Sequence, residues 1–512
     1  MLVPLDKLCT ITIYSHFFKI TDINVVLTKY IYRFCLKYVI RDLVRIRNES
    51  PIMKITTIFS TRVKDGSEYR FHIGQLEPFM NHLKENYMDH DRIEFIKEEM
   101  YTPVSIVTKL RDKWKYRPEQ EDARKFILDK FNYNDQSRLI TMPTGTGKTL
   151  LGTGVSAEIG KRIAIFILPK YIDKWVIDIA TYLEADKKEV MVVTGGDRLR
   201  GLIEMGNNGT YDYKYLIISL NTLQNFYKSY LEGHDEYGCK PEDLCKLLGI
   251  GTLIFDEIHQ FIHAIYTTLT FTHVPKIIGL SATFLSDNKT IDEIHRIMFP
   301  REIRFDKIKM KKYIKAYAIA YNFQNFQSLK LKTKEFRSNV YSHTSFEKSI
   351  IKNRSVLPKY LDLIKYLIDI SYIAEYKEGD KAIIFCATVK LCGIVVEFLK
   401  LAYPNKDIRR YAEDDPYENI IEPDIRVTTI LSGGTAIDIP NLRVSILTVS
   451  IKSPQANIQT LGRLREIKDR SVKFYYIYCV NIPKQVEYHR MKMDLIGEKV
   501  ATLTELNYPR LL

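Results

Sequence analysis

The chain has 512 residues, of which 46% are hydrophobic and 27% charged, a balance typical of globular proteins. Lysine and arginine outnumber aspartate and glutamate by 76 to 62, and the resulting net charge of +14 favours a polyanionic partner, usually nucleic acid. The seven cysteines form no CxxC pair and no apolar run is long enough to span a bilayer, which argues against a disulfide framework, a zinc site and a membrane protein. We therefore expect a cytoplasmic protein.

Residues 1–112 lack the strand–helix rhythm of the later chain and are expected to form a small α+β accessory domain. Within residues 28–48 a basic side chain recurs every fourth position, at Lys29, Arg33, Lys37, Arg41 and Arg45. On one α-helix this spacing makes a basic stripe. The stripe is either the solvated face of a core helix or a contact surface for nucleic-acid phosphates, with a membrane-surface helix as a third alternative.

From residue 113 to residue 306, short apolar runs rich in isoleucine and valine alternate with helical segments. Strands are expected at 138–142, 162–169, 189–195, 215–220, 252–257 and 276–283. Runs of this kind suit a parallel sheet covered on both faces, which predicts an α/β domain.

The glycine-rich stretch "MPTGTGKTLL" lies where the first of these strands ends and a helix begins. Gly145 and Gly147 let backbone N–H groups approach phosphate oxygens, and the helix N-terminus adds its positive dipole end. Lys148 would reach the β- and γ-phosphates, and Thr149 would hold Mg²⁺ through its hydroxyl. The full phosphate-loop pattern has glycine where this chain has Met142, so a chance glycine loop is the alternative.

A second signal follows the apolar run "TLIF", which ends in the acidic stretch "DEIH". There Asp256 can hold Mg²⁺, and Glu257 can orient or deprotonate an attacking water. His259 can hydrogen-bond towards a neighbouring motif. A solvated acidic turn is the alternative, but it explains poorly why a phosphate loop precedes it.

"PTGTGKT" and "DEIH" together resemble superfamily 2 helicases of the DEAH/DExH type, and other blocks follow in the order of that family. The resemblance implies ATP and Mg²⁺ as cofactors and two tandem RecA-like parallel-sheet domains that form a helicase core. It also implies that Gln120 of "YRPEQ" reads adenine and that "GLSAT" couples hydrolysis to domain movement. The remaining residues that it implicates in this half are Thr144 and Thr146 in the phosphate loop, Pro169, Lys170, Asn221 and Thr222 as nucleic-acid contacts, and Ser281, Ala282 and Thr283 in the coupling block.

The α/β rhythm returns over residues 307–512, which we expect to form the second RecA-like domain. "QTLGRLRE" resembles helicase motif VI, with Gln459 contacting nucleotide and an arginine finger that stabilises charge on the γ-phosphate. Arg463 matches directly. The usual final arginine is replaced by Glu466, so Arg463 and Arg465 are predicted jointly as the finger.

"TILSGGTAIDIPNL" resembles motif V, with Thr435 as a nucleic-acid contact and Asp438 in coupling. Ala436 stands where that family has glycine, a departure at a position of backbone contact. The departures at Met142, Ala436 and Glu466 motivate a different hypothesis, a nucleic-acid-binding module with an inactive ATPase.

The length of the N-terminal region and the block "IIKNRSVLPKYLDLIKYL" resemble the small phage recombination helicases of the UvsW type and their T5-like relatives. This resemblance implies a monomeric DNA helicase or translocase that acts on forked DNA and Holliday junctions in phage replication and recombination, in the host cytoplasm. An RNA-directed or transcript-release helicase of superfamily 2 is the alternative, because backbone-contacting motifs do not distinguish ribose from deoxyribose.

Overall fold

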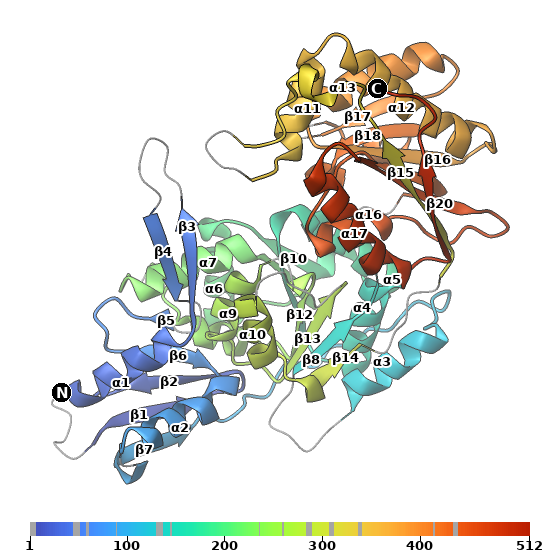
Figure 1. The fold of residues 1–512 in the computed structure, drawn as a ribbon. Coiled ribbons are helices and arrows are strands. Elements are labelled where there is room, and N and C mark those ends of the chain that lie inside the picture. Colours follow the sequence, from blue (N-terminus) through green and yellow to red (C-terminus); the bar gives the residue numbers. More distant parts are fainter. Residues whose placement is uncertain are drawn as a thin grey trace. The chain divides into compact units, whose positions relative to one another are not determined.

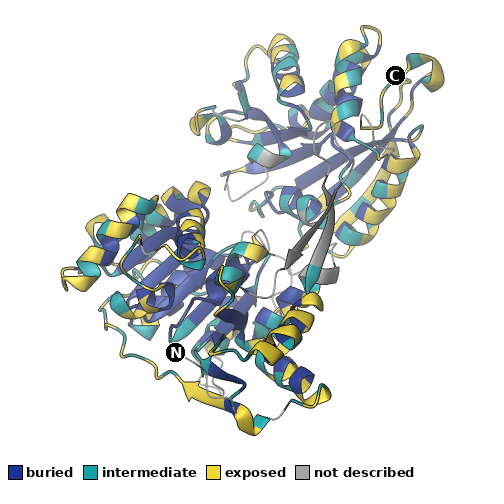
Figure 2. Cartoon of the chain, turned by 90° about the vertical axis from the view of Figure 1, so that its left-hand side faces the viewer, coloured by how far each residue is buried: buried dark blue, intermediate teal, exposed yellow. Residues whose placement is uncertain are grey.

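The computed structural model describes the chain except for residues 1–6, 45–51, 58–60, 89, 130–136, 144–145, 235, 259–260, 283–288, 307–311, 336–339, 413–414 and 434–438 (Figure 1). The chain divides into two compact units, Met1–Met142 with Thr146–Ile308 and Pro143–Gly145 with Lys309–Leu512. In both units the central strands are buried and the outer faces of the helices are exposed (Figure 2). Within the described part of the chain, no helix combines the length and apolar character needed to cross a membrane.

The first unit begins with a five-stranded mixed sheet covered by two helices. The strand order is β5 (Thr61–Arg62), β6 (Tyr69–His72), β2 (Phe17–Thr21), β1 (Cys9–Ile13) and β7 (Ile93–Lys97). Helices α1 (Val25–Leu36) and α2 (Leu76–Glu85) pack through Phe34 and Phe79, whose ring centroids lie 5.2 Å apart. The region thus has the mixture of helix and sheet expected for a small α+β domain.

The long basic helix expected over residues 28–48 is wrong. Helix α1 ends at Leu36, and the chain then forms β3 (Val39–Val44), which pairs antiparallel with β4 (Ile52–Thr57). The segment after Leu36 is rich in Val and Ile, and β-branched side chains lose rotamer freedom in a helix and pack well on a sheet.

The five basic residues therefore do not share one helical stripe. Lys29 and Arg33 lie on α1, and Lys37 caps its C-terminus. Arg41 lies on β3, and Arg45 lies outside the described residues. The spacing of four residues therefore does not place these basic side chains on one face of one element. It does not support a shared surface that contacts phosphates.

The same unit continues into a seven-stranded sheet in which every neighbouring pair is parallel. The strand order is β10 (Val190–Val193), β11 (Tyr215–Ser219), β9 (Ile163–Ile167), β12 (Thr252–Phe255), β13 (Lys276–Ser281), β8 (Ser137–Thr141) and β14 (Arg304–Phe305). The helices are α3 (Pro118–Leu128), α4 (Lys148–Ile159), α5 (Ile172–Tyr182), α6 (Gly196–Asn207), α7 (Leu220–Leu231), α8 (Leu244–Leu247), α9 (Ile262–Leu269) and α10 (Lys289–Met298).

The second unit is built around another seven-stranded parallel sheet. Its order is β17 (Ile408–Tyr411), β18 (Ile425–Thr429), β16 (Lys381–Cys386), β19 (Leu442–Leu447), β20 (Val472–Cys479), β15 (Ile314–Tyr321) and β21 (Thr502–Asn507). The helices are α11 (His343–Lys352), α12 (Val356–Ile368), α13 (Val389–Ala402), α14 (Glu418–Ile421), α15 (Ile430–Gly433), α16 (Pro454–Leu461) and α17 (Pro483–Gly497). The predicted fold class, two tandem RecA-like domains after a small α+β region, is confirmed.

A buried cluster of charges joins the N-terminal sheet to the α/β part of the first unit. Arg70 of β6 has no exposed surface and donates to both carboxylate oxygens of Glu242, at 2.9 and 3.0 Å. Lys19 of β2 lies 3.2 Å from the same carboxylate, and the Arg70 guanidinium lies 4.4 Å from the ring centroid of Phe271. The N-terminal region is thus attached by a specific, desolvated contact.

Candidate nucleotide and nucleic-acid site

The glycine-rich loop leaves the sheet at the carboxyl end of β8. Met142 is completely buried, and its N–H donates to the carbonyl of Ser281 at 2.9 Å. In the full phosphate-loop pattern this position holds glycine. Here it extends the pairing between β8 and β13, and a buried methionine is compatible with that extended backbone. Gly147 caps α4 with a φ of +84°, a left-handed conformation that favours glycine. Thr144 and Gly145 lie outside the described residues.

Lys148 and the acidic pair meet at the carboxyl edge of the first parallel sheet. The Lys148 Nζ lies 3.2 Å from the Glu257 Oε1, and both side chains are largely buried. The Trp175 indole N–H donates to the Asp256 Oδ2 at 3.1 Å. Burial and the neighbouring charge of Glu257 raise the pKa of the Asp256 carboxyl above its ordinary value, although Lys148 opposes them.

The chemistry of these donors fits a magnesium ion. Thr149 lies in the first turn of α4, the helix after β8, with its side chain largely buried. Asp256 directly follows β12, which β13 separates from β8 in the sheet. In the described part of the chain no three His, Cys, Asp or Glu side chains form a metal cage. Magnesium does not need one, because it takes one or two carboxylates and fills its octahedron with water and phosphate oxygens.

The side chain of Gln120 is hydrogen-bonded to the backbone of the phosphate loop. Its fully buried amide Nε2 donates to the carbonyls of Thr146, at 2.7 Å, and Gly147, at 3.2 Å. Its Oε1 accepts from the N–H of Arg117 at 2.8 Å. The structure thus gives the side chain a role that the sequence did not suggest, and contact with adenine stays a prediction.

Replacing Gly147 by alanine tests this packing. An added Cβ would lie 2.4 Å from the Gln120 Nε2 and would force a side chain into left-handed backbone. We expect Gly147→Ala to weaken ATP binding by about 5- to 30-fold, because a backbone strain of roughly 1–2 kcal/mol would displace the loop from the conformation that presents its N–H groups to phosphate. Gly201→Ala is the matched control, because Gly201 lies within α6 with open space around its Cβ position. Equal nucleotide affinities for the two variants would contradict the prediction.

The predicted nucleic-acid contacts lie along the carboxyl ends of β9 and β11, which are neighbours in the sheet. Pro169, Lys170 and Asn221 are exposed there. Thr222 is buried, and its hydroxyl accepts a hydrogen bond from the N–H of Gly195 at 2.8 Å. Since Gly195 follows β10, Thr222 holds the adjoining loop in place, and the exposed residues are better placed to contact a ligand.

The remaining predicted residues of the first unit are only partly described. Ser281 and Ala282 are buried at the end of β13, next to the strand that precedes the phosphate loop. Their backbone connection through Met142 gives the coupling block a direct link to that loop. His259 and Thr283 lie outside the described residues.

In the second unit, the predicted arginine-finger residues follow helix α16. Gln459 lies on α16, and Gly462 caps it. Arg463 is largely buried, whereas Arg465 is partly exposed and donates to the carbonyl of Gly462. The choice between the two arginines as the finger remains a prediction. Thr435 and Asp438 lie outside the described residues.

A hollow of about 640 Å³ opens at the carboxyl ends of β16, β18 and β19 in the second unit. Its lining includes the hydroxyl-bearing Thr344, Thr429 and Ser450 together with Lys452. Thr429, Ile430 and Ser432 of this lining belong to the stretch that resembles motif V, whereas Thr344, Ser450 and Lys452 were not predicted from the sequence. Hydroxyl and ammonium groups at the carboxyl edge of a parallel sheet are suited to a polar, anionic ligand.

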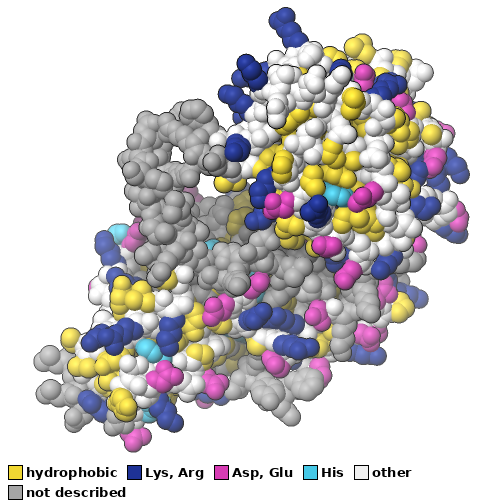
Figure 3. Space-filling model, in the orientation of Figure 1, with side chains coloured by type: hydrophobic (Ala, Val, Ile, Leu, Met, Phe, Trp, Pro, Cys, Tyr) yellow, Lys and Arg dark blue, Asp and Glu magenta, His cyan; other side chains and the backbone are white. Residues whose placement is uncertain are grey.

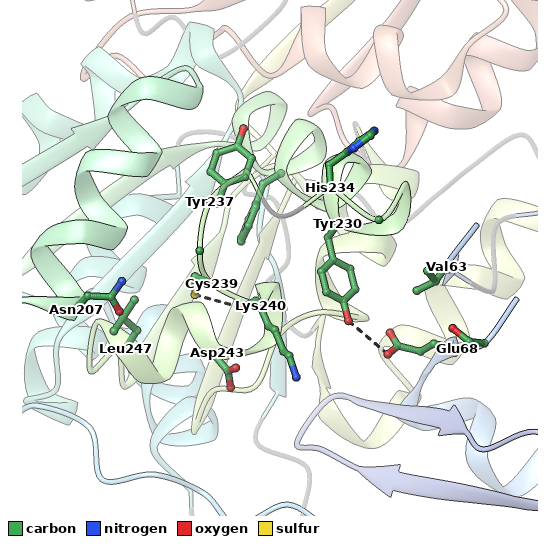
Figure 4. A pocket seen from close by; sticks show the side chains of 14 residues that line it. Val63, Glu68, Asn207, Tyr230, His234, Tyr237, Cys239, Lys240, Asp243 and Leu247 are labelled. Carbon is green, nitrogen blue, oxygen red and sulfur yellow. Dashed lines mark hydrogen bonds between the residues drawn. The ribbon is translucent and has the colours of Figure 1, made fainter. Parts of the chain in front are cut away.

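A separate hollow of about 700 Å³ lies between the N-terminal sheet region and the α/β part of the first unit (Figure 4). Its wall includes Glu68 from the N-terminal region and Tyr230, Tyr237 and Lys240 from the α/β part. The Tyr230 hydroxyl donates to the Glu68 carboxylate at 3.4 Å. None of the site residues predicted from the sequence lines this hollow.

Comparisons with known proteins agree with the motif pattern. Residues 113–286 match the family described as the type III restriction enzyme, res subunit. Over 376 residues the chain is 23% identical to the general transcription and DNA repair factor IIH helicase/translocase subunit XPB of Schizosaccharomyces pombe. That alignment covers 71% of this chain but 42% of the relative, so the chain spans less than half of the relative's length.

Among solved structures, S. cerevisiae Dbp5 bound to RNA and ADP BeF₃ aligns with a TM-score of 0.49 and 12% identity. The alignment covers 77% of this chain and 90% of the Dbp5 chain. The family match and the XPB alignment support the resemblance to superfamily 2 helicases and the prediction of an enzyme. They do not bear on the resemblance to phage helicases.

Proposed function

We propose that this protein is an ATP-dependent helicase or translocase of superfamily 2 that acts on nucleic acid. The observation that carries the proposal is the contact of Lys148 with Glu257, 3.2 Å apart, beside Asp256 at the carboxyl edge of a parallel sheet. A phosphate-loop lysine and paired carboxylates in this position are suited to binding and hydrolysing a nucleoside triphosphate.

Each side chain has a distinct task in this proposal. Lys148 binds phosphate oxygens, and Thr149 with Asp256 would hold magnesium, which neutralises charge on the transferred phosphoryl group when bound. Glu257 orients the attacking water once Lys148 has turned to the nucleotide. Arg463 and Arg465 are retained as candidates for the finger, with Gln459 as a nucleotide contact.

We further propose DNA, with forks and Holliday junctions as preferred substrates. The XPB relative is named for transcription and DNA repair, which supports DNA, and the net charge of +14 supports a polyanion. The phage replication and recombination role, a monomeric state and the host cytoplasm stay part of the proposal. The division of the chain into domains of residues 1–112, 113–306 and 307–512 is also part of the proposal.

A substrate panel tests the choice of nucleic acid. ATP turnover and strand displacement are measured with single-stranded DNA, forked DNA, Holliday junctions and RNA duplexes, with ATP and with a non-hydrolysable analogue. We expect stimulation by DNA and displacement that requires hydrolysis and favours branched substrates. Stimulation by RNA alone would replace the DNA proposal by an RNA-directed helicase.

A further inference from the structure

Four lysines surround a hollow of about 380 Å³ in the second unit, and none of them is among the site residues predicted from the sequence. Lys330 and Lys332 come from the segment after the short 3₁₀ helix η8 (Phe326–Leu329), and Lys348 and Lys352 come from α11. The lining also contains Ser345, Ser349, Asn353 and two leucines, but no acidic residue. We call this feature the lysine hollow.

Within the part of the chain that the structure describes, no acidic side chain pairs with the lysines of the lysine hollow. Glu347 on the same helix is buried and turned inwards, where it accepts from the N–H of Ala387 at 2.8 Å and the hydroxyl of Thr388 at 3.0 Å. Lys and Arg side chains gather over this side of the second unit (Figure 3). Like charges around one hollow repel each other, and an anion would relieve that repulsion.

The position of the lysine hollow indicates which anion it takes. Thr344 lines the 640 Å³ hollow at the carboxyl edge of the second sheet, and the next residue, Ser345, lines the lysine hollow. The two hollows therefore adjoin across the first turn of α11. Lys348 and Lys352 follow one helical turn apart, about 6 Å along the axis, which is within reach of successive phosphates of one strand.

We propose that the lysine hollow binds the phosphate backbone of a nucleic-acid strand that continues from the carboxyl edge of the second sheet along α11. This inference rests on the proposed function and extends the nucleic-acid path beyond the helicase motifs. The contacts are made by flexible ammonium groups to phosphates, so they are indifferent to sequence and sensitive to salt.

The test is the salt dependence of binding to single-stranded DNA, measured by fluorescence anisotropy on the full chain. Replacing all four lysines by alanine should reduce the slope of log affinity against log salt by roughly 2 to 3, since each phosphate that a lysine neutralises adds about 0.7. Lys359→Ala/Lys400→Ala is the control, because it removes two exposed lysines of α12 and α13, outside the hollow. Arginine at the four positions should restore the slope, and ATP turnover without DNA should not change.

Three outcomes would overturn the inference. If the alanine variant matches the control in slope while the wild type is stimulated by DNA, the lysine hollow fails and the proposed function survives. If the wild type neither binds DNA nor responds to it, both fail. If the alanine variant keeps its DNA slope but no longer binds polyglutamate, the hollow serves an acidic protein partner instead.

Discussion

Lys148→Ala is expected to reduce ATP turnover by about 100- to 1,000-fold, in the range found when one preorganised charge-stabilising group is removed from an active site. The ammonium group contacts the acidic pair, with its Nζ 3.2 Å from the Glu257 Oε1. Its loss removes the group that binds phosphate oxygens. It also removes one of the charges that oppose the raised pKa of Asp256, the other being Lys174, so the carboxyl becomes harder to ionise. Steady-state phosphate release in the presence of DNA measures the effect.

Lys188→Ala is the matched control, because Lys188 is an exposed lysine of the same α/β domain, remote from the phosphate loop in the sequence. Its turnover should stay within about twofold of the wild type, since exposed substitutions rarely change more than about 0.5 kcal/mol. Equal turnover for the wild type and Lys148→Ala would contradict the ATPase assignment. The hypothesis of a nucleic-acid-binding module with an inactive ATPase would then be favoured.

The parallel sheets could be predicted because their signal is local. The strands are short apolar runs rich in Ile and Val, and a helical segment separates each from the next, as α5 does between β9 and β10. Helix α1 shows where local signals fail. A four-residue spacing of charges continues past Leu36, but the β-branched residues that follow pair with β4 instead.

The part of the candidate site that could be predicted is the part set by the order of the strands in the sheet. Strand order brings the ends of β8, β12 and β13 together, so Lys148 and Glu257 meet although 109 residues separate them. The hydrogen bonds of Gln120 and Thr222 depend on which backbone groups lie beside their side chains. A pattern in the sequence does not indicate those neighbours. Trp175 is a further example, because its hydrogen bond to Asp256 depends on how α5 packs against the sheet.

Arg70→Met is expected to lower the free energy of unfolding of the first unit by about 3–5 kcal/mol, the range for removing one partner of a buried ion pair. The substitution keeps an apolar side chain of similar length against Phe271 but leaves Glu242 buried beside a single cation, Lys19. Urea unfolding, with amide hydrogen exchange in β1 and β6, would assign the lost stability to the N-terminal sheet.

Lys7→Met provides the comparison, because Lys7 pairs with Asp22 and Glu94, whose side chains are more than half exposed. Exposed pairs contribute about 0–1 kcal/mol, so its unfolding should stay close to that of the wild type. Equal loss of stability in Arg70→Met and Lys7→Met would show that the buried cluster does not hold the N-terminal region in place.

The pH dependence of the free energy of unfolding can separate the contribution of the Glu242 charge from that of its packing. Burial alone would raise the pKa of Glu242, but the charges of Arg70 and Lys19 outweigh it and lower the pKa to about 2. Because the pKa is lower in the folded state, the stabilisation is complete above the ordinary value of about 4.5 and declines as the pH falls from there towards 2. The difference in stability between the wild type and Glu242→Gln should therefore be constant near neutral pH and shrink below pH 4.5. A difference that stays constant down to the acid transition would assign the contribution of Glu242 to packing and hydrogen bonding rather than to its charge.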